Sequence, residues 1–148
     1  MEFRTRPKSD YLRDAEWQEL HALSLHWQSD MIFFGDELRF FNLLIDKYFA
    51  SLVNPNTITI TKDVAAKLSH IKQTYEYLYQ KVLKHLQHTE KFVVGPPSVD
   101  GSTFRDEHAA LEEELVAFTK SFRDMKHNLF QLTDHVIKDD KQKHLIGS

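Results

Sequence analysis

The chain has 148 residues and no cysteine, and its 19 basic residues against 22 acidic ones give a net charge of -3. This length predicts one domain over residues 1–148, and the absence of thiols excludes a disulfide framework, a thiolate metal site and a cysteine nucleophile. Because the basic residues are scattered rather than gathered on one stripe, we expect no nucleic-acid partner.

The sequence carries no sign of secretion or of a membrane span. Residues Met1 to Asp10 are charged and lack an apolar core segment, and nowhere do about 18 uncharged apolar residues run together. A chain without cysteine also fits a reducing compartment. We therefore expect a cytoplasmic protein with no membrane partner.

The first predicted helix spans about residues 10–53. Ser9 or Asp10 would cap its start, and the Asn54-Pro55-Asn56 turn would end it. Gly35, near the middle, is where such a long helix could bend or divide. Apolar residues at alternating spacings of three and four share one helical face. In this helix they form a main column, which consists of Leu20, Trp27, Met31, Phe34, Leu38, Phe41, Ile45, Tyr48 and Leu52.

A second column beside the main one widens the apolar face of this helix. Its members are Glu19, Leu23, His26, Asp30, Phe33, Glu37, Phe40 and Leu44. A face this wide has to be covered on two sides, and a three-helix monomer need not supply both covers. The pattern therefore predicts a homo-oligomer or a protein partner, with self-association completing a larger bundle.

Two further helices are predicted at about residues 61–91 and 103–138. A capping threonine within residues 57–61 would open the first of them, and Ser102 or Thr103, with Asp106, resembles a capping box that would open the second. The polar tail, residues 139–148, is expected to fray. Their apolar columns are Val64, Leu68, Ile71, Tyr75, Leu78, Val82 and His85 in one helix, and Phe104, His108, Leu111, Leu115, Phe118, Phe122, Met125, Leu129, Leu132 and Val136 in the other.

Three long helices joined by short connections predict an all-α fold, an up-down-up antiparallel bundle. Two acids of the first helix interrupt its apolar surface: Asp30 and Glu37 each lie between phenylalanines of the two columns. An ionised carboxyl buried without a partner is strongly destabilising, so these acids must be protonated, paired, hydrogen-bonded or bound to a metal.

Counting residues back from the two turns places several polar side chains in one layer of the bundle. Asp30, His85 and His108 fall level with one another, His26 and Glu112 lie one helical turn away, and Glu37 falls level with Tyr75. The candidate metal ligands are therefore His26, Asp30, Glu37, His85, His108 and Glu112. Histidine and carboxylate donors on facing helices suit zinc, iron or manganese. The alternative is a structural polar layer, with Tyr75, that fixes the alignment of the helices.

The pair His108-x3-Glu112 resembles a fragment of the hemerythrin-like pattern, in which five histidines and two carboxylates surround a di-iron centre. The resemblance covers these five residues only. The chain has no His-x3-His pair, and the Glu-x2-His motif of ferritin-like proteins is missing from its apolar columns. Iron chemistry is therefore not carried over to this chain.

The sequence lacks a Gly-rich phosphate loop, a Ser-His-Asp signature and a zinc-protease motif. Catalysis is thus unsupported. The leading hypothesis is a non-catalytic cytoplasmic helical-bundle protein that acts through protein–protein contact or self-association. The alternative is a metal-binding bundle, mono- or dinuclear, that uses the His/Asp/Glu layer.

Overall fold

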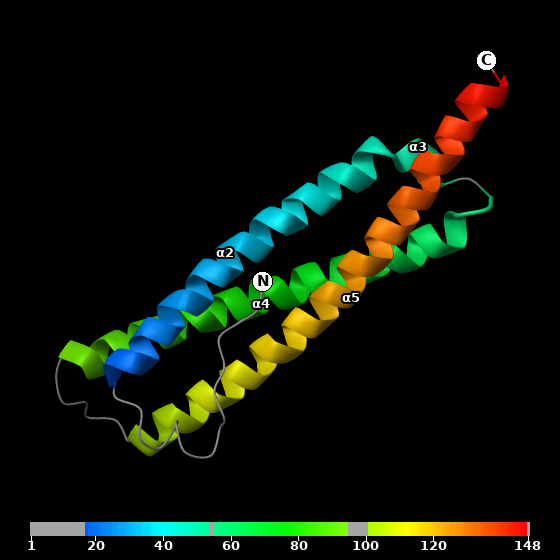
Figure 1. The fold of residues 1–148 in the computed structure, drawn as a ribbon. Helices are drawn as coiled ribbons and strands as arrows, with labels where there is room; N and C mark the ends of the chain where they lie inside the picture. The colour runs from blue at the N-terminus through cyan, green and yellow to red at the C-terminus, as the bar shows by residue number, and fades with distance from the viewer. Residues whose placement is uncertain (1–16, 54, 95–100, 148) are drawn as a thin grey trace. The chain divides into compact units, whose positions relative to one another are not determined.

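The computed structural model describes residues 17–53, 55–94 and 101–147, with side chains described for 17–53, 55–91 and 101–138. Four helices account for nearly all of these residues, and no strand occurs among them: α2 Trp17–Lys47, α3 Phe49–Leu52, α4 Ile58–Val94 and α5 Gly101–Gly147 (Figure 1). The predicted all-α class is confirmed. In the same described residues, no helix combines the length and apolar character that a membrane crossing requires.

Helix α2 passes through Gly35 without interruption, so this glycine does not divide it. The reason for a glycine here is steric, because a Cβ at residue 35 would overlap the hydroxyl of Tyr75 on α4. The regular helix gives way to a turn at Tyr48, and the short helix α3 follows. The predicted start near Ser9 or Asp10 lies outside the described residues.

Helix α4 begins at Ile58, earlier than predicted. The hydroxyls of Thr57 and Thr61 both donate to the carbonyl of Leu52, at 2.9 and 2.6 Å. Carbonyls at the end of a helix have no partner within it, so these two threonines stabilise the end of α3.

Helix α5 begins at Gly101 and continues to Gly147. Ser102 and Thr103 therefore lie inside the helix, and the predicted cap at these residues is wrong. The predicted end near Lys138 is also wrong. Residues 139–146 contain neither glycine nor proline, and long polar side chains such as lysine and glutamine favour helix, so polarity alone did not end it.

The chain divides into two compact units, and each long helix contributes one segment to each of them. Unit 1 consists of Met1–Gly35 with Thr74–Thr119, and unit 2 of Asp36–Gln73 with Lys120–Ser148. Each unit has its own apolar core. The core of unit 1 is Leu20, Trp27, Met31, Phe34, Leu78, Val82, Leu86, Phe104, Leu111, Leu115 and Phe118, and that of unit 2 is Leu38, Phe41, Leu52, Val64, Leu68, Ile71, Phe122, Met125, Leu129, Leu132 and Val136.

The helical period predicted these cores closely. Every member of the α5 column is buried, including His108, and in α2 and α4 only Ile45, Tyr48 and Tyr75 are half-buried instead. The second column of α2 behaves differently, because Phe33 and Phe40 are 45% and 53% exposed. Its members Leu23, Asp30, Glu37 and Leu44 are half-buried, so each unit covers its part of this column only partly.

Candidate functional site

The most unusual feature of unit 1 is a pair of buried histidines, His85 on α4 and His108 on α5. Nε2 of His85 lies 2.7 Å from Nδ1 of His108, a hydrogen-bond distance, and both residues are 0% exposed. Each occupies a position that the helical period assigns to the core: His85 follows Val82, and His108 lies between Phe104 and Leu111. The sequence thus forces two polar rings into apolar surroundings.

Aromatic rings enclose the pair. Trp27 of α2 stacks on His108 with ring centroids 4.5 Å apart, and Phe104 stacks on His85 at 4.7 Å and an interplanar angle of 9°. Trp17 meets the edge of Phe104 at 5.5 Å. These contacts leave little solvent near the imidazoles, so their charged forms are disfavoured.

Burial accordingly lowers the pKa of both histidines. Desolvation, with a smaller contribution from His88, lowers the pKa of His85 from 6.5 to about 4. Desolvation, then His85 and Arg105, lowers the pKa of His108 to about 3. Both imidazoles are therefore neutral at pH 7, and each carries one N–H donor and one nitrogen acceptor.

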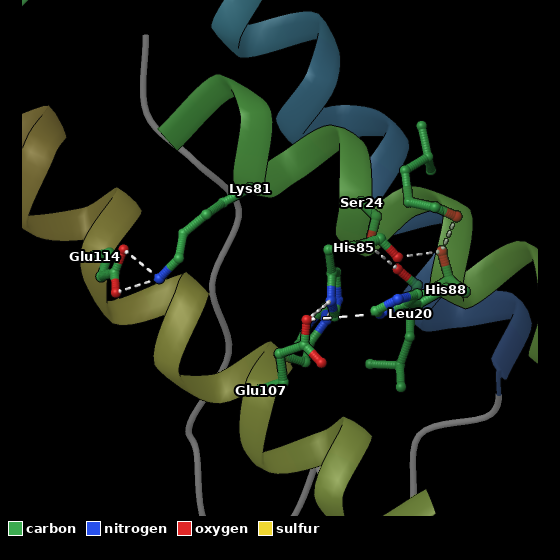
Figure 2. A network of polar contacts seen from close by, with 10 residues as sticks. Leu20, Ser24, Lys81, His85, His88, Glu107 and Glu114 are labelled. Atoms are coloured by element: carbon green, nitrogen blue, oxygen red, sulfur yellow. Dashed lines mark hydrogen bonds and ion pairs between the residues drawn. The ribbon is translucent and has the colours of Figure 1, made fainter. Parts of the chain in front are cut away.

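One carboxylate approaches the pair from the surface. In Figure 2, Glu107 points toward His85 and His88, and its Oε1 lies 3.8 Å from Nδ1 of His85 and 3.6 Å from Nδ1 of His88. The side chains of Glu107 and His88 are both 48% exposed. Glu107 is thus a partly exposed carboxylate that lies next to the buried histidine pair.

Other buried polar groups of unit 1 find local partners. The hydroxyl of Ser24 donates to the Leu20 carbonyl at 2.8 Å, and that of Thr89 donates to the Leu86 carbonyl at 2.8 Å. Nδ1 of His21 lies 3.3 Å from the same threonine oxygen. By contrast, Nε1 of Trp27, Nδ1 of His85 and Nε2 of His108 have no hydrogen-bond partner among the described residues.

A groove of about 430 Å³ in unit 1 is lined by residues of α4 and α5. Lys81 is one of its lining residues. Its Nζ lies 3.0 and 3.3 Å from the two carboxylate oxygens of Glu114 (Figure 2) and 4.9 Å from the ring centre of Tyr77. Hydrogen bonds with Tyr77 and Glu114 raise the pKa of Lys81. The lysine is already paired within the protein, which disfavours a role in binding an anionic ligand.

The structure brings together only part of the predicted metal layer. His85 and His108 are in contact, Glu112 is buried at 1% exposure, Asp30 is half-buried and His26 is exposed, all of them in unit 1. Both Asp30 and Glu112 have interactions within the protein. In the described part of the chain, no three His, Cys, Asp or Glu side chains are arranged to hold a metal ion.

The sixth predicted ligand, Glu37, belongs to unit 2. Its Oε1 lies 3.0 Å from Nζ of Lys126 on α5, and its side chain is 20% exposed. Tyr75, which the sequence places level with Glu37, lies in unit 1, where its hydroxyl is close to Gly35. Glu37 therefore satisfies one of the options set for a half-buried carboxylate, an ion pair with a cation.

Two participants in the site were not predicted from the sequence. The sequence analysis places Trp27 only in the apolar column and predicts no role for Glu107. A signal for Glu107 was present, because counting residues back from the turn between the last two helices places His88 level with about residue 106, next to Glu107. The stacking of Trp27 on His108 had no comparable signal, since an apolar column does not specify ring orientation.

No protein-family model matches this chain, and searches for similar curated proteins and solved structures return no match either. The protein defined here is an all-α protein with a neutral histidine pair in its core. Its function has to be argued from its own surface and core.

Proposed function

We propose that this protein is a non-catalytic helical-bundle protein that functions by self-association, through the exposed apolar side of α2. The proposal rests on one observation. Both units expose large apolar side chains on this helix: Leu25, Ile32 and Phe33 in unit 1, and Phe40 and Leu43 in unit 2. Single exposed apolar residues are ordinary, but several on one helix are typical of an interaction surface.

These side chains lie away from the core of their units. In unit 1, Leu25 and Ile32 are separated by two helical turns and share one side of α2, whereas Trp27 and Phe34, with the same separation, are buried on another. In unit 2, Phe40 and Leu43 are exposed while Leu38 and Phe41 are buried. A second copy of the chain would supply a surface of matching chemistry against which these residues could be removed from water.

For the topology, we infer an up-down-up antiparallel arrangement within a single domain. Contacts of unit 1 support it, because they run in inverse order along the two chain segments. His21 of α2 meets Thr89 of α4, Trp27 meets His85, and Gly35 meets Tyr75. Between α4 and α5, Lys81 pairs with Glu114, and His85 with His108. In a larger bundle, a partner would pack against the exposed side of α2.

The test is the molar mass in solution, by size-exclusion chromatography with light scattering at micromolar concentration. We expect a multiple of the monomer mass for the wild type. Two double variants replace exposed apolar residues of α2 by polar ones: Ile32→Gln with Phe33→Ser in unit 1, and Phe40→Ser with Leu43→Gln in unit 2. Each double variant is expected to weaken the oligomer. Matched controls are Val116→Gln and Ile60→Gln, which remove exposed apolar side chains from α5 and α4. Loss of the oligomer in the controls alone would contradict the proposal.

The alternative is a metal-binding bundle, and it has its own test. Metal content is measured after purification without an affinity tag or chelator, followed by thermal melting with and without EDTA. A ligand that binds only the folded state raises the melting temperature, so a bound metal predicts a lower melt in EDTA. Because self-association needs no metal, we expect EDTA to leave the melting temperature unchanged.

We also propose a cytoplasmic location, which cell fractionation would test.

A further inference from the structure

In unit 1, the exposed side of α2 includes a stripe of residues without charge, which we call the neutral stripe. It consists of Gln18, Ala22, Leu25, Ser29 and Ile32, and all five residues are exposed. Their spacings alternate between four and three residues, so they lie on one line along the helix. This spacing is typical of the line along which one helix packs against another in a coiled coil.

The other two helices of unit 1 expose charged side chains. The exposed charged residues include Glu76, Lys84, Glu90 and Lys91 on α4, and Asp106, Glu107 and Glu113 on α5. A charged surface placed against the neutral stripe would lose hydration without gaining an opposite charge. The stripe therefore fits a partner surface that is itself uncharged, and the neutral stripe of a second copy meets this requirement.

Large and small side chains alternate along the neutral stripe. Leu25 and Ile32 are large, whereas Ala22 and Ser29 are small. In a parallel pair of identical helices each residue meets its own counterpart, so the layers that contain Ala22 and Ser29 would be underfilled. In an antiparallel pair, Leu25 of one copy lies level with Ser29 of the other, and Ile32 lies level with Ala22. Each of these layers then contains one large and one small side chain, so the stripe is complementary to itself in the antiparallel direction.

Charge at the edge of the stripe favours the same direction. Glu19 is exposed next to Gln18, and a parallel pair would bring the Glu19 carboxylates of the two copies to one level, where like charges repel. The antiparallel pair has its two-fold axis level with residue 27, midway between Leu25 and Ser29. At a rise of about 1.5 Å per residue, the two Glu19 residues then lie about 24 Å apart along the helices. This separation removes most of their repulsion, because it exceeds the screening length of about 8 Å at physiological salt.

We propose that two copies of the chain associate through the neutral stripe, with their α2 helices packed side by side and antiparallel about a two-fold axis. This inference rests on the proposed self-association and adds the direction and the paired residues of the interface. Because both copies use the same surface, association through the stripe closes at a dimer.

Distances between spin labels, measured by electron paramagnetic resonance, test the direction. The chain has no cysteine, so a nitroxide label attaches only where a cysteine is introduced. We compare Glu19→Cys with His26→Cys, because both positions are exposed and lie seven residues apart on the same edge of the stripe. The antiparallel pair predicts a separation along the helices of about 24 Å at residue 19 and about 3 Å at residue 26. The spacing between packed helices, about 8–10 Å, adds a sideways component at both sites.

The other outcomes separate this inference from the proposed function. Short distances at both sites would show a parallel pair, and long distances at both would show that the copies meet elsewhere. Either result overturns the antiparallel stripe and leaves self-association standing. An unlabelled wild type that is monomeric by light scattering at the same concentration contradicts both proposals.

A second measurement uses the chain without substitutions, in case a label dissociates the pair. In a mixture of ¹³C-labelled and unlabelled chains, isotope-filtered NMR detects contacts between copies. We expect cross-peaks between the methyl groups of Ile32 and Ala22 from different copies. An oligomeric sample without these cross-peaks would contradict the proposed pairing.

Discussion

Nε2 of His85 and Nδ1 of His108 lie 2.7 Å apart between two helices of unit 1, enclosed by Trp27 and Phe104. The bond connects two neutral rings, because burial lowers the pKa of both. A hydrogen bond inside an apolar core forms only when the two helices are aligned so that its donor and acceptor meet. The pair therefore fixes how α4 and α5 align in this unit, and its neutrality makes the fold sensitive to acid.

The first prediction concerns pH. The pKa of each buried histidine is lower in the folded protein than the ordinary value of 6.5 expected in the unfolded chain. The unfolded chain therefore binds more protons as the pH falls below 6.5, and stability is lost in that direction. By pH 5 the loss should reach about 2 kcal/mol for each of the two histidines. Urea denaturation at pH 8, 6 and 5 measures it.

A control separates the buried pair from the other histidines. His127→Gln removes an exposed histidine of α5 and should leave the pH dependence unchanged, whereas the double variant His85→Leu with His108→Leu should flatten it. A double variant as acid-sensitive as the wild type would assign the effect to other groups.

The second prediction concerns the energy of the pair itself. His85→Leu leaves Nδ1 of His108 without its partner and should reduce the free energy of unfolding by about 1–3 kcal/mol. His108→Leu should act similarly on His85. The two changes together should cost less than the sum of the single changes, because no imidazole nitrogen is then left without its partner. Simple additivity in a double-mutant cycle would show that the two rings do not stabilise each other.

The third prediction concerns Gly35. Alanine normally favours a helix over glycine by about 1 kcal/mol, but a methyl group here overlaps the Tyr75 hydroxyl. We therefore expect Gly35→Ala to destabilise the protein, by roughly 1–3 kcal/mol. The penalty should shrink in a Tyr75→Phe background, which removes the oxygen. Ser29→Ala, at an exposed position of α2, is the matched control and should be neutral or stabilising. A stabilising Gly35→Ala would refute the steric explanation.

The fourth prediction concerns cooperativity. Leu115 in unit 1 and Leu129 in unit 2 are both 0% exposed and lie on the same helix, α5. Because all three long helices contribute to both units, we expect the chain to unfold in one transition. Leu115→Ala and Leu129→Ala should each reduce the free energy of unfolding of the whole chain by about 2–5 kcal/mol. Two separate melting steps in calorimetry, each shifted by only one variant, would show that the units fold independently.

Much of the fold was predictable from the sequence, because helical period alone decides which face of a helix is buried. Every apolar position of the α5 column is buried. Helix ends were harder to place. The end of α5 was predicted too early because polar composition resembles a frayed tail. The hydroxyls of Thr57, just before α4, and Thr61, in its first turn, donate to the carbonyl of Leu52 instead of capping a helix start.

The site was predictable in part. Both His85 and His108 were expected in one layer, and they are in contact. Counting residues along hairpins gives the level of a side chain but neither its direction nor its distance, so His26 was included although it is exposed. The exposed side of α2 was underestimated for a related reason: Leu25, Ile32 and Leu43 fall outside both predicted columns, and only the packed structure separates buried from exposed apolar residues.

The most direct test of the proposed function is sedimentation velocity over a dilution series, with the wild type beside the Ile32→Gln/Phe33→Ser variant. We predict a concentration-dependent oligomer for the wild type and a shift toward monomer for a variant that remains helical by circular dichroism. A wild type that sediments as a monomer at every micromolar concentration would contradict self-association through α2.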